Sequence, residues 1–213
     1  YESYINHCID TIFPFEIFLT ENKRLNNPAD KLRLKNIKND ILGTDIPLTT
    51  LIQKYNLKTT KTIITEDNIA YTNNTCKYVS KKVRKMLGMK GEYELGEKLV
   101  CRKFFKIVRK DEDGKGQSIN INKNFEYVIV GITDKAMTLK DENTSETITS
   151  KNAFKLFIIF IQSYCNTCHS LQGSSIKKPI TIHEWNFKHV SRKWLYTAIT
   201  RATELDNVYF MIS

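Results

Sequence analysis

Apolar positions recur at helical spacing in several segments, and this periodicity predicts most of the helices. In residues 27–43, Asn27 is a suitable N-cap, Pro28 suits the first turn and Gly43 can end the helix. Its predicted apolar stripe consists of Leu32, Leu34, Ile37, Ile41 and Leu42. Residues 48–55 predict a second, shorter helix.

Two later segments have the same periodicity. Residues 76–88 are strongly basic and end at Gly88, a residue type common at helix C-termini. The apolar face of this segment is predicted to contain Val79, Val83, Met86 and Leu87. Its basic residues are predicted to form a solvated face. Alternatively, Lys77, Lys81 or Lys82 contacts a nucleic-acid phosphate. Residues 190–203 predict a helix close to the C-terminal end.

Short apolar runs and apolar–polar alternation predict the strands. Outside the central part of the chain, such patterns occur at residues 12–25, 61–74, 153–164, 178–187 and 206–213. From Glu92 to about Thr149 there are only period-two runs, separated by turn signals such as Asp113-Gly114. The central part of the chain is therefore predicted to be a small all-β module.

The order of these elements predicts an α/β fold. Strands and helices alternate on both sides of the all-β module, which is typical of a parallel sheet with helices on both faces. We divide the chain into a first α/β part at residues 1–90, an inserted small β-barrel at residues 91–150, and residues 151–213, which complete the α/β domain.

The composition is that of a globular protein with an excess of cations. Of the 213 residues, 41% are hydrophobic and 26% are charged. Lys and Arg outnumber Asp and Glu by 33 to 23, which gives a net charge of +10. This excess favours a polyanionic partner, nucleic acid before a membrane; a solvated basic surface is the alternative. The many Asn, Lys and Ile residues are typical of AT-rich genomes, which include those of large DNA viruses.

The sequence predicts an intracellular protein. The first residues include Glu2 and Asp10 and lack a long apolar core, so we do not interpret them as a signal peptide. The longest apolar run, residues 154–161, is too short to span a bilayer. Five cysteines, an odd number without an export signal, predict reduced thiols.

Residues 163–189 contain three overlapping motifs. The first is C-x-x-C-H, the attachment signal of c-type haem, which the predicted intracellular setting argues against. The second has the zinc-site spacing C-x2-C-x14-H-x5-H, with Cys165, Cys168, His183 and His189 as ligands. The residues between its halves contain a Gly-Ser loop, a proline and a strand pattern instead of the helix of a zinc finger. A zinc ion that staples this loop remains an alternative.

The third motif is T-x-H-x-x-Q-G, and the string L-Y-T-A-I-T-R-A follows it about 30 residues later. These two strings resemble motifs V and VI of superfamily 1 helicases. The resemblance implies that Arg201 points at the γ-phosphate of ATP, a role that suits its planar, permanently charged fork. It also implies that Thr167 and His169 hold the DNA backbone, and that Gln172 and Gly173 lie towards the nucleotide.

Two upstream strings support the same resemblance. L-T-E-N-K-R-L resembles the stretch that opens the second RecA-like domain, so that Arg24 is a second arginine reaching the triphosphate. I-A-Y-T-N-N resembles a strand–turn–helix whose side chains and backbone amides grip a DNA phosphate, which implies that Tyr71, Thr72 and Asn73 bind DNA. The all-β module resembles the SH3-like barrel of the RecD-like members, which translocate 5′ to 3′.

The resemblance covers residues 17–211 and has two departures. Lys23 stands where many relatives have an aromatic residue, so adenine stacking is not implied at that position. Ser174-Ser175 stand where some branches have a glutamate that contacts the ribose, so this contact is not transferred either.

The sequence contains no G-x-x-x-x-G-K-[S/T] loop and no acidic pair on an apolar strand for Mg²⁺. We therefore expect ATP and Mg²⁺ to be bound mainly by a preceding, N-terminal RecA-like domain of the same protein, and this chain alone to be inactive. The predicted function is the C-terminal motor domain of an ATP-dependent superfamily 1 DNA helicase that grips single-stranded DNA during translocation in replication or repair. The residues are compatible with RNA as well.

Two alternatives belong to other functional classes. One is a zinc-stabilised nucleic-acid-binding module without motor activity. The other is an α/β interaction domain that has kept the fold and lost the chemistry.

Overall fold

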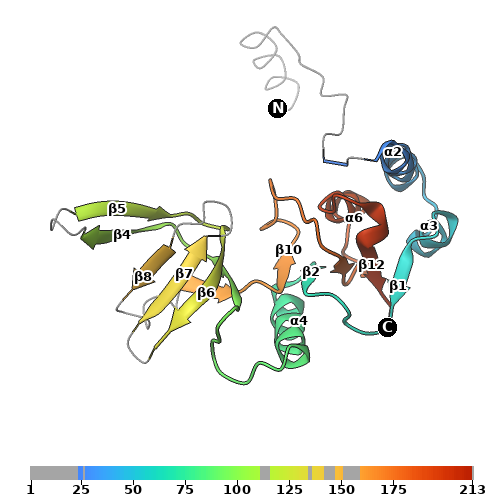
Figure 1. Cartoon of the computed structure of the whole chain (residues 1–213). Coiled ribbons are helices and arrows are strands. Elements are labelled where there is room, and N and C mark those ends of the chain that lie inside the picture. The colour runs from blue at the N-terminus through green and yellow to red at the C-terminus, as the bar shows by residue number, and fades with distance from the viewer. Residues whose placement is uncertain are drawn as a thin grey trace, which may run out of the picture.

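The protein contains two β-sheet units of opposite type, seen side by side in the computed structural model (Figure 1). The structure describes residues 24–25, 27–110, 116–133, 136–141, 147–150 and 159–212. The strand predicted at residues 12–25 lies almost wholly outside these residues, as do Lys23 and the first half of the predicted strand at 153–164.

The first unit is a five-stranded parallel sheet with the order β1-β12-β11-β2-β10. Its strands are β1 (Lys58–Thr60), β2 (Asp67–Ala70), β10 (Cys165–Thr167), β11 (Ile180–Ile182) and β12 (Val208–Met211). In the register, Ala70 of β2 is opposite Thr167 of β10, and Ile69 is opposite Ile182 of β11. The loops that follow these three strands therefore start side by side at one edge of the sheet.

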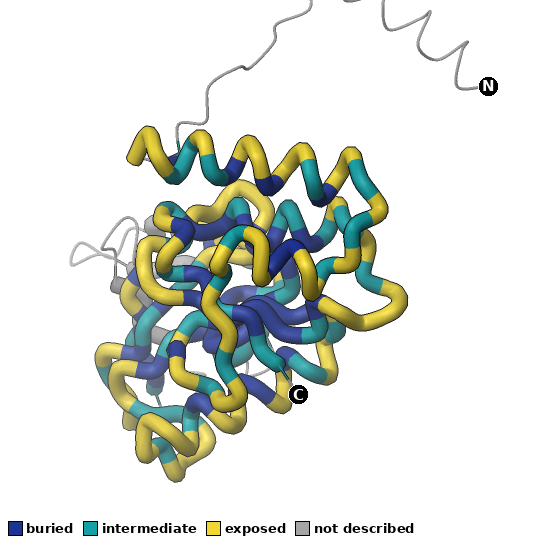
Figure 2. Tube along the Cα trace, turned by 90° about the vertical axis from the view of Figure 1, so that its right-hand side faces the viewer, coloured by how far each residue is buried: buried dark blue, intermediate teal, exposed yellow. Residues whose placement is uncertain are grey.

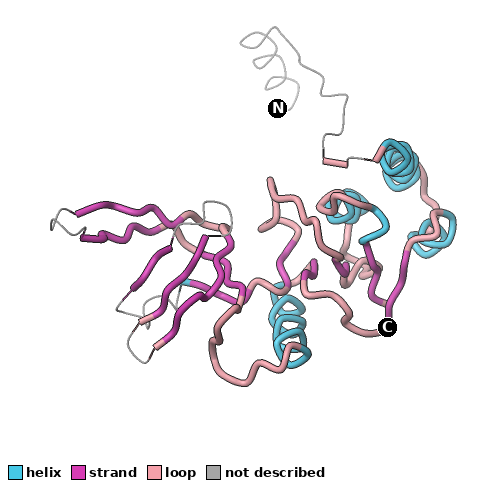
Figure 3. The backbone as a smooth tube through the Cα atoms, viewed as in Figure 1, coloured by secondary structure: helices cyan, strands magenta, loops and turns pink. Residues whose placement is uncertain are grey.

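Helices cover both faces of this sheet, as Figures 1 and 3 show. They are α2 (Pro28–Gly43), α3 (Leu48–Lys54), α4 (Asn73–Met86) and α6 (Arg192–Ile199), with a 3₁₀ turn η1 (Leu205–Asn207) before the last strand. Neighbouring residues of β2 point to opposite faces: Ile69 packs with the α2 and α6 side, and Ala70 packs with α4. The predicted α/β fold with a parallel sheet is confirmed.

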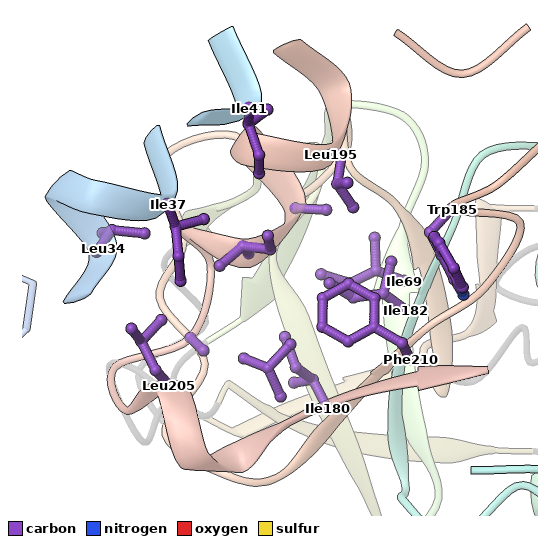
Figure 4. Close-up of a cluster of buried hydrophobic side chains, with 14 of the residues drawn as sticks. Leu34, Ile37, Ile41, Ile69, Ile180, Ile182, Trp185, Leu195, Leu205 and Phe210 are labelled. Atoms are coloured by element: carbon purple, nitrogen blue, oxygen red, sulfur yellow. The ribbon is translucent and has the colours of Figure 1, made fainter. Parts of the chain in front are cut away.

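The larger core lies between the sheet and the α2, α3 and α6 side (Figure 4). Ile69, Ile180, Ile182 and Phe210 of the strands meet side chains of the helices there. Each fully buried Leu or Ile side chain in such a cluster contributes about 1.5–3 kcal/mol. Figure 2 shows the same distribution along the chain, with buried positions gathered at the centre and exposed ones outside.

Local signals placed the helices correctly, but two apolar stripes are narrower than predicted. The Asn27 side chain accepts from the Ala29 amide and caps α2, and Pro28 begins the helix. Among the predicted stripe residues, Leu34, Ile37 and Ile41 are buried, whereas Leu32 and Leu42 are 61% and 43% exposed. In α4, Val79 and Val83 are buried, whereas Met86 and Leu87 are exposed. A helix lying on a sheet buries one line of residues, and the flanking positions stay outside.

The strand predicted at residues 61–74 is also shorter than predicted. Only Asp67–Ala70 are extended in the sheet, and the residues from Asn73 onward already form α4. Thr72, as the N-cap of α4, ends the extended segment.

The second unit is antiparallel, with the order β8-β7-β6-β3-β9, and a separate two-stranded ladder joins β4 and β5. The strands are β3 (Lys98–Cys101), β4 (Phe105–Lys110), β5 (Gly116–Ile121), β6 (Glu126–Ile132), β7 (Met137–Asp141), β8 (Thr147–Ser150) and β9 (Phe160–Gln162). Most of these strands lie in the predicted all-β segment. β9 follows residue 150 and pairs with β3. Closure into a barrel stays a prediction.

Two ion pairs fasten the antiparallel unit to the parallel one. Arg84, near the end of α4, contacts the fully buried Glu97 at 2.5 Å, and its guanidinium also donates to the Glu92 carbonyl oxygen. Lys98 of β3 contacts Asp67 of β2 at 3.3 Å. Burial raises the pKa of Glu97, while Arg84 acts in the opposite direction. Within the described ranges, no helix is both long and apolar enough to cross a bilayer.

Candidate functional site

The loop between β10 and β11 begins with a tight turn that Thr167 organises. The Thr167 hydroxyl accepts from the Ser170 amide at 3.3 Å and lies 3.2 Å from the Ser170 hydroxyl. Further along, Gly173 has φ +89°, a left-handed conformation that L residues rarely adopt. No other atom lies within 4 Å of the place where a Cβ of Gly173 would be, so its backbone conformation, not crowding, favours glycine here.

Arg201 lies just after α6, two residues beyond the last helical residue Ile199, and its side chain holds this loop. Its Nη1 donates to the carbonyl oxygens of Leu171, at 3.1 Å, and Ser174, at 3.3 Å. Its Nε donates to the Thr197 carbonyl at 3.2 Å. The backbone supports the same junction, because the Arg201 carbonyl accepts from the Ile176 amide at 2.7 Å.

Arg201 is 8% exposed, and its guanidinium lacks a carboxylate partner among the described residues. The acceptors of its hydrogen bonds are all neutral carbonyl or hydroxyl oxygens. Burial lowers the pKa of Arg201, and the nearby positive charge of Arg24 lowers it further. A buried cation in such surroundings is stabilised by an incoming anion, and the planar fork of arginine suits phosphate.

Arg24 approaches the same loop from the N-terminal side. Its Nε donates to the Ser175 hydroxyl at 2.7 Å, and its Nη1 donates to the Thr200 carbonyl at 2.6 Å. The two arginines, 177 positions apart in sequence, therefore converge on the loop that contains Gln172 and Gly173. The Gln172 side chain is exposed. These four predicted residues are brought together.

The predicted DNA-binding residues gather at the neighbouring edge of the sheet. Tyr71, Thr72 and Asn73 follow β2, and Thr167 and His169 end or follow the adjacent β10. Thr72 is the N-cap of α4, since its hydroxyl accepts from the Thr75 amide at 3.2 Å. Tyr71, Asn73 and His169 are exposed.

Glu184, which the sequence interpretation missed, occupies the turn that was predicted to grip a phosphate. Its Oε2 accepts from the amides of Tyr71, at 2.9 Å, and Thr72, at 2.8 Å. Its Oε1 accepts from the hydroxyls of Thr72, at 3.0 Å, and Thr75, at 2.7 Å. Glu184 itself has φ +55°. The available signal, a lone acidic residue after a strand, is too common to have identified it.

The four residues of the zinc spacing have other partners. Cys168 packs in the large core, and Cys165 packs in a separate cluster with Cys76 and Val79 of α4. His183 Nε2 lies 2.9 Å from Asn68 Oδ1, and His189 packs against Phe187. In the part of the chain that the structure describes, no three His, Cys, Asp or Glu side chains are grouped for a metal ion. The zinc alternative is therefore not favoured.

A pocket of about 760 Å³ lies between the Thr167–Lys178 loop and the antiparallel unit. The loop residues Leu171–Ser175 line it, although neither Arg24 nor Arg201 does. Its charged lining consists of Lys98, Lys123, Lys177, Lys178, Asp67 and Glu126. The same loop therefore contacts the arginines and forms one wall of a mostly cationic pocket.

A comparison with protein-family models matched residues 162–209 to the UvrD-like helicase C-terminal domain. The matched segment contains both the T-x-H-x-x-Q-G and the L-Y-T-A-I-T-R-A strings. This match supports a superfamily 1 helicase C-terminal domain. A comparison with curated protein sequences gave no match.

The fold is similar to solved structures of Pif1 helicases. Bacteroides Pif1 bound to ssDNA has a TM-score of 0.57 and 15% identity, covering 92% of this chain and 52% of that one. Bacteroides Pif1 in complex with ADP-AlF3 and ssDNA has a TM-score of 0.57 and 14% identity, and the match covers 92% of this chain and 52% of that one. Pif1 from Candida albicans has a TM-score of 0.55 and 11% identity, and the match covers 91% of this chain and 56% of that one. This chain thus has the RecA-like fold and spans about half the length of these helicases.

Proposed function

We propose that this chain is the C-terminal motor domain of an ATP-dependent superfamily 1 DNA helicase. The observation that carries the proposal is the environment of Arg201. A cation that is buried among neutral oxygens, at the junction of the two helicase-like strings, is suited to stabilise the charge that develops on a transferred phosphoryl group.

In this proposal, ATP and Mg²⁺ are held mainly by an N-terminal RecA-like domain of the same protein. Arg24 and Arg201 complete the site from this chain, and Gln172 and Gly173 lie next to the nucleotide. The convergence of both arginines on the loop at residues 171–175 supports this arrangement. Alone, the chain hydrolyses no ATP, because it has no phosphate-binding loop of its own.

Single-stranded DNA is the proposed partner, with RNA as an alternative substrate. Thr167 and His169 contact the strand from the end of β10, and Tyr71, Thr72 and Asn73 lie along it where the chain passes from β2 into α4. The adjacent ends of β2 and β10 support a continuous binding edge. Closure on ATP and opening after hydrolysis would move the strand along this edge during replication or repair.

The proposed domain division places the α/β parts at residues 1–90 and 151–213 and an SH3-like module at 91–150, with β9 completing the sheet of that module. Such a module supports membership of the RecD-like branch. An intracellular site of action, in a virus with a large AT-rich genome, fits the composition.

The decisive experiment measures ssDNA-stimulated ATP hydrolysis by the protein that contains both motor domains. Arg201→Lys keeps a cation but removes the fork, and we expect kcat to fall by about 10³-fold or more while the protein stays folded. Arg192→Lys is the matched control, because Arg192 also donates to backbone carbonyls, those of Ile41 and Ile46, at the other end of α6.

Two results would contradict the proposal. Unchanged ATP turnover in the Arg201→Lys variant would remove Arg201 from the ATP site. Hydrolysis of ATP by residues 1–213 alone would show that the nucleotide site lies elsewhere. A thermal melt of each variant separates loss of activity from loss of structure.

A further inference from the structure

The turn at Tyr71 and Thr72 already has an anion bound to it. Both oxygens of the Glu184 carboxylate are used, one by the two backbone amides and the other by the two threonine hydroxyls. Two amides and two hydroxyls are also the donors that a phosphate would use at the start of a helix. With Glu184 in place, the Tyr71 and Thr72 amides are not available to a DNA phosphate.

Besides Asn73, an aromatic side chain is exposed at this turn. The Tyr71 ring lies against the indole of Trp194, with the ring centroids 5.6 Å apart and the planes at 80°. Tyr71 is 37% exposed. Trp194 belongs to the first turn of α6 and is partly buried against the large core, which restrains its ring. The Ser191 hydroxyl, the N-cap of α6, accepts from the Trp194 amide at 3.1 Å and fixes this turn.

The sequence around this aromatic pair is cationic. Residues 73–91, which include α4, contain six Lys or Arg residues (Lys77, Lys81, Lys82, Arg84, Lys85 and Lys90) and no Asp or Glu. Residues 185–203, which include α6, contain Lys188, Arg192, Lys193 and Arg201 and again no acidic residue. Glu184, which directly precedes the second of these segments, is engaged in the turn. A partly exposed aromatic pair next to cation-rich segments is typical of surfaces that bind single-stranded nucleic acid.

We propose that Tyr71 and Trp194 form a stacking platform for the unpaired bases of a single strand, and that Glu184 is the positioning residue that holds Tyr71 in it. The inference rests on the proposed function and sharpens it at this turn. Bases stack on the rings, while phosphates are contacted by Asn73 and by the surrounding cations. The platform tolerates any base, because every base has a π-face.

The test compares an oligonucleotide with an abasic strand of the same length, using fluorescence anisotropy on the protein that contains both motor domains. Tyr71→Ala should weaken binding of the oligonucleotide by about 5- to 150-fold and leave the weaker binding of the abasic strand unchanged. Tyr71→Phe, which keeps the ring, should bind like the wild type. Tyr78→Ala is the matched control, because Tyr78 is an exposed aromatic residue on α4, 59% exposed, away from the turn.

Variants of Glu184 distinguish base stacking from phosphate binding. Glu184→Gln keeps an acceptor for both amides, so it should retain base-dependent affinity. Glu184→Ala should lose part of the base-dependent affinity, because the Tyr71 amide no longer has the carboxylate that holds it in place. If Glu184→Ala instead binds the abasic strand more tightly than the wild type does, the freed amides take a phosphate and the inference is wrong.

Intrinsic fluorescence gives a second readout. Trp185 and Trp194 are the two tryptophans, and Trp185 is 2% exposed, with its Nε1 donating to the Met211 carbonyl. Strand binding should therefore quench Trp194 selectively. If the wild type binds single strands but Tyr71→Ala has no effect, the platform is rejected and the helicase proposal stands. If the wild type does not bind single strands, both are rejected.

Discussion

Arg201 and Glu184 are both held by neutral partners, but they differ in what they leave unsatisfied. Arg201 is a buried cation that donates to neutral carbonyl and hydroxyl oxygens, and no carboxylate is among its hydrogen-bond acceptors in the described chain. Glu184 is a partly buried anion whose two oxygens accept four hydrogen bonds from amides and hydroxyls. The region around Arg201 is therefore suited to bind an anion from outside, whereas the turn at Thr72 already binds the carboxylate of Glu184. Proximity to a strand end or helix end does not by itself make a phosphate site.

The Arg84–Glu97 pair is the reference for this comparison, because there a fully buried charge does have a counter-charge. Arg84→Ala should lower the free energy of unfolding by about 3–5 kcal/mol, since it leaves the Glu97 carboxylate buried without a counter-charge. Urea unfolding measures the loss. The double variant Arg84→Met/Glu97→Leu should recover most of it, because both charges are then removed.

A loss of stability much smaller than this in Arg84→Ala would contradict the comparison between Arg201 and Glu184. It would mean that this fold tolerates a buried charge without a counter-charge. The neutral surroundings of Arg201 would then no longer argue for an anion.

The second prediction concerns the pH dependence of stability, which His183 should affect at the same edge of the sheet. The Asn68 amide nitrogen donates to the carbonyls of Thr65, Glu66 and Tyr164, so Asn68 Oδ1 is the acceptor for His183 Nε2–H. Burial lowers the pKa of His183 to about 4. Because the folded pKa lies below the unfolded value, the neutral ring stabilises the fold fully above about pH 6.5, and this contribution is lost as the pH falls towards 4.

Between those pH values, we expect the free energy of unfolding to fall by up to about 1.4 kcal/mol per pH unit on account of His183. His183→Gln should remove this component, since glutamine can donate to Asn68 and does not titrate. Equal slopes in the two proteins, measured by urea unfolding from pH 4.5 to 7, would assign the pH dependence to other groups.

The smallest expected effect is at Thr72, which caps α4 and donates to Glu184. Thr72→Ala should cost about 1 kcal/mol of stability, as loss of an N-cap usually does. Thr72→Ser keeps the hydroxyl and should remain within a few tenths of a kcal/mol of the wild type. If Thr72→Ala leaves the free energy of unfolding unchanged, Glu184 holds the turn without the N-cap hydroxyl.

The sequence was most informative where a structural feature depends on neighbouring residues. Asn27, Pro28 and Gly43 mark the ends of α2 correctly, because capping and φ preferences act within a few residues. The parallel sheet could also be predicted, since strands and helices alternate along the chain. The exposure of Leu32 and Leu42 could not, because it depends on how the helix lies on the sheet.

Contacts between distant residues could not be found in the sequence. The contacts of Glu184 with Tyr71 and Thr72 span 113 and 112 positions, and no local pattern announces them. The site residues were proposed from the resemblance, and the structure adds which of them converge. The apolar run at residues 153–164 likewise conceals a change of sheet, since Phe160–Gln162 and Cys165–Thr167 belong to different units.

That change of sheet has a mechanical consequence. Only Ser163 and Tyr164 separate the two strands, both are 1% exposed, and their backbones are bonded to Lys98 and Asn68. A connection so short and so deeply buried leaves little room for the two sheets to rotate independently. We therefore expect a rotation of the antiparallel unit to be passed on to β10, and so to Thr167 and the loop held by Arg201.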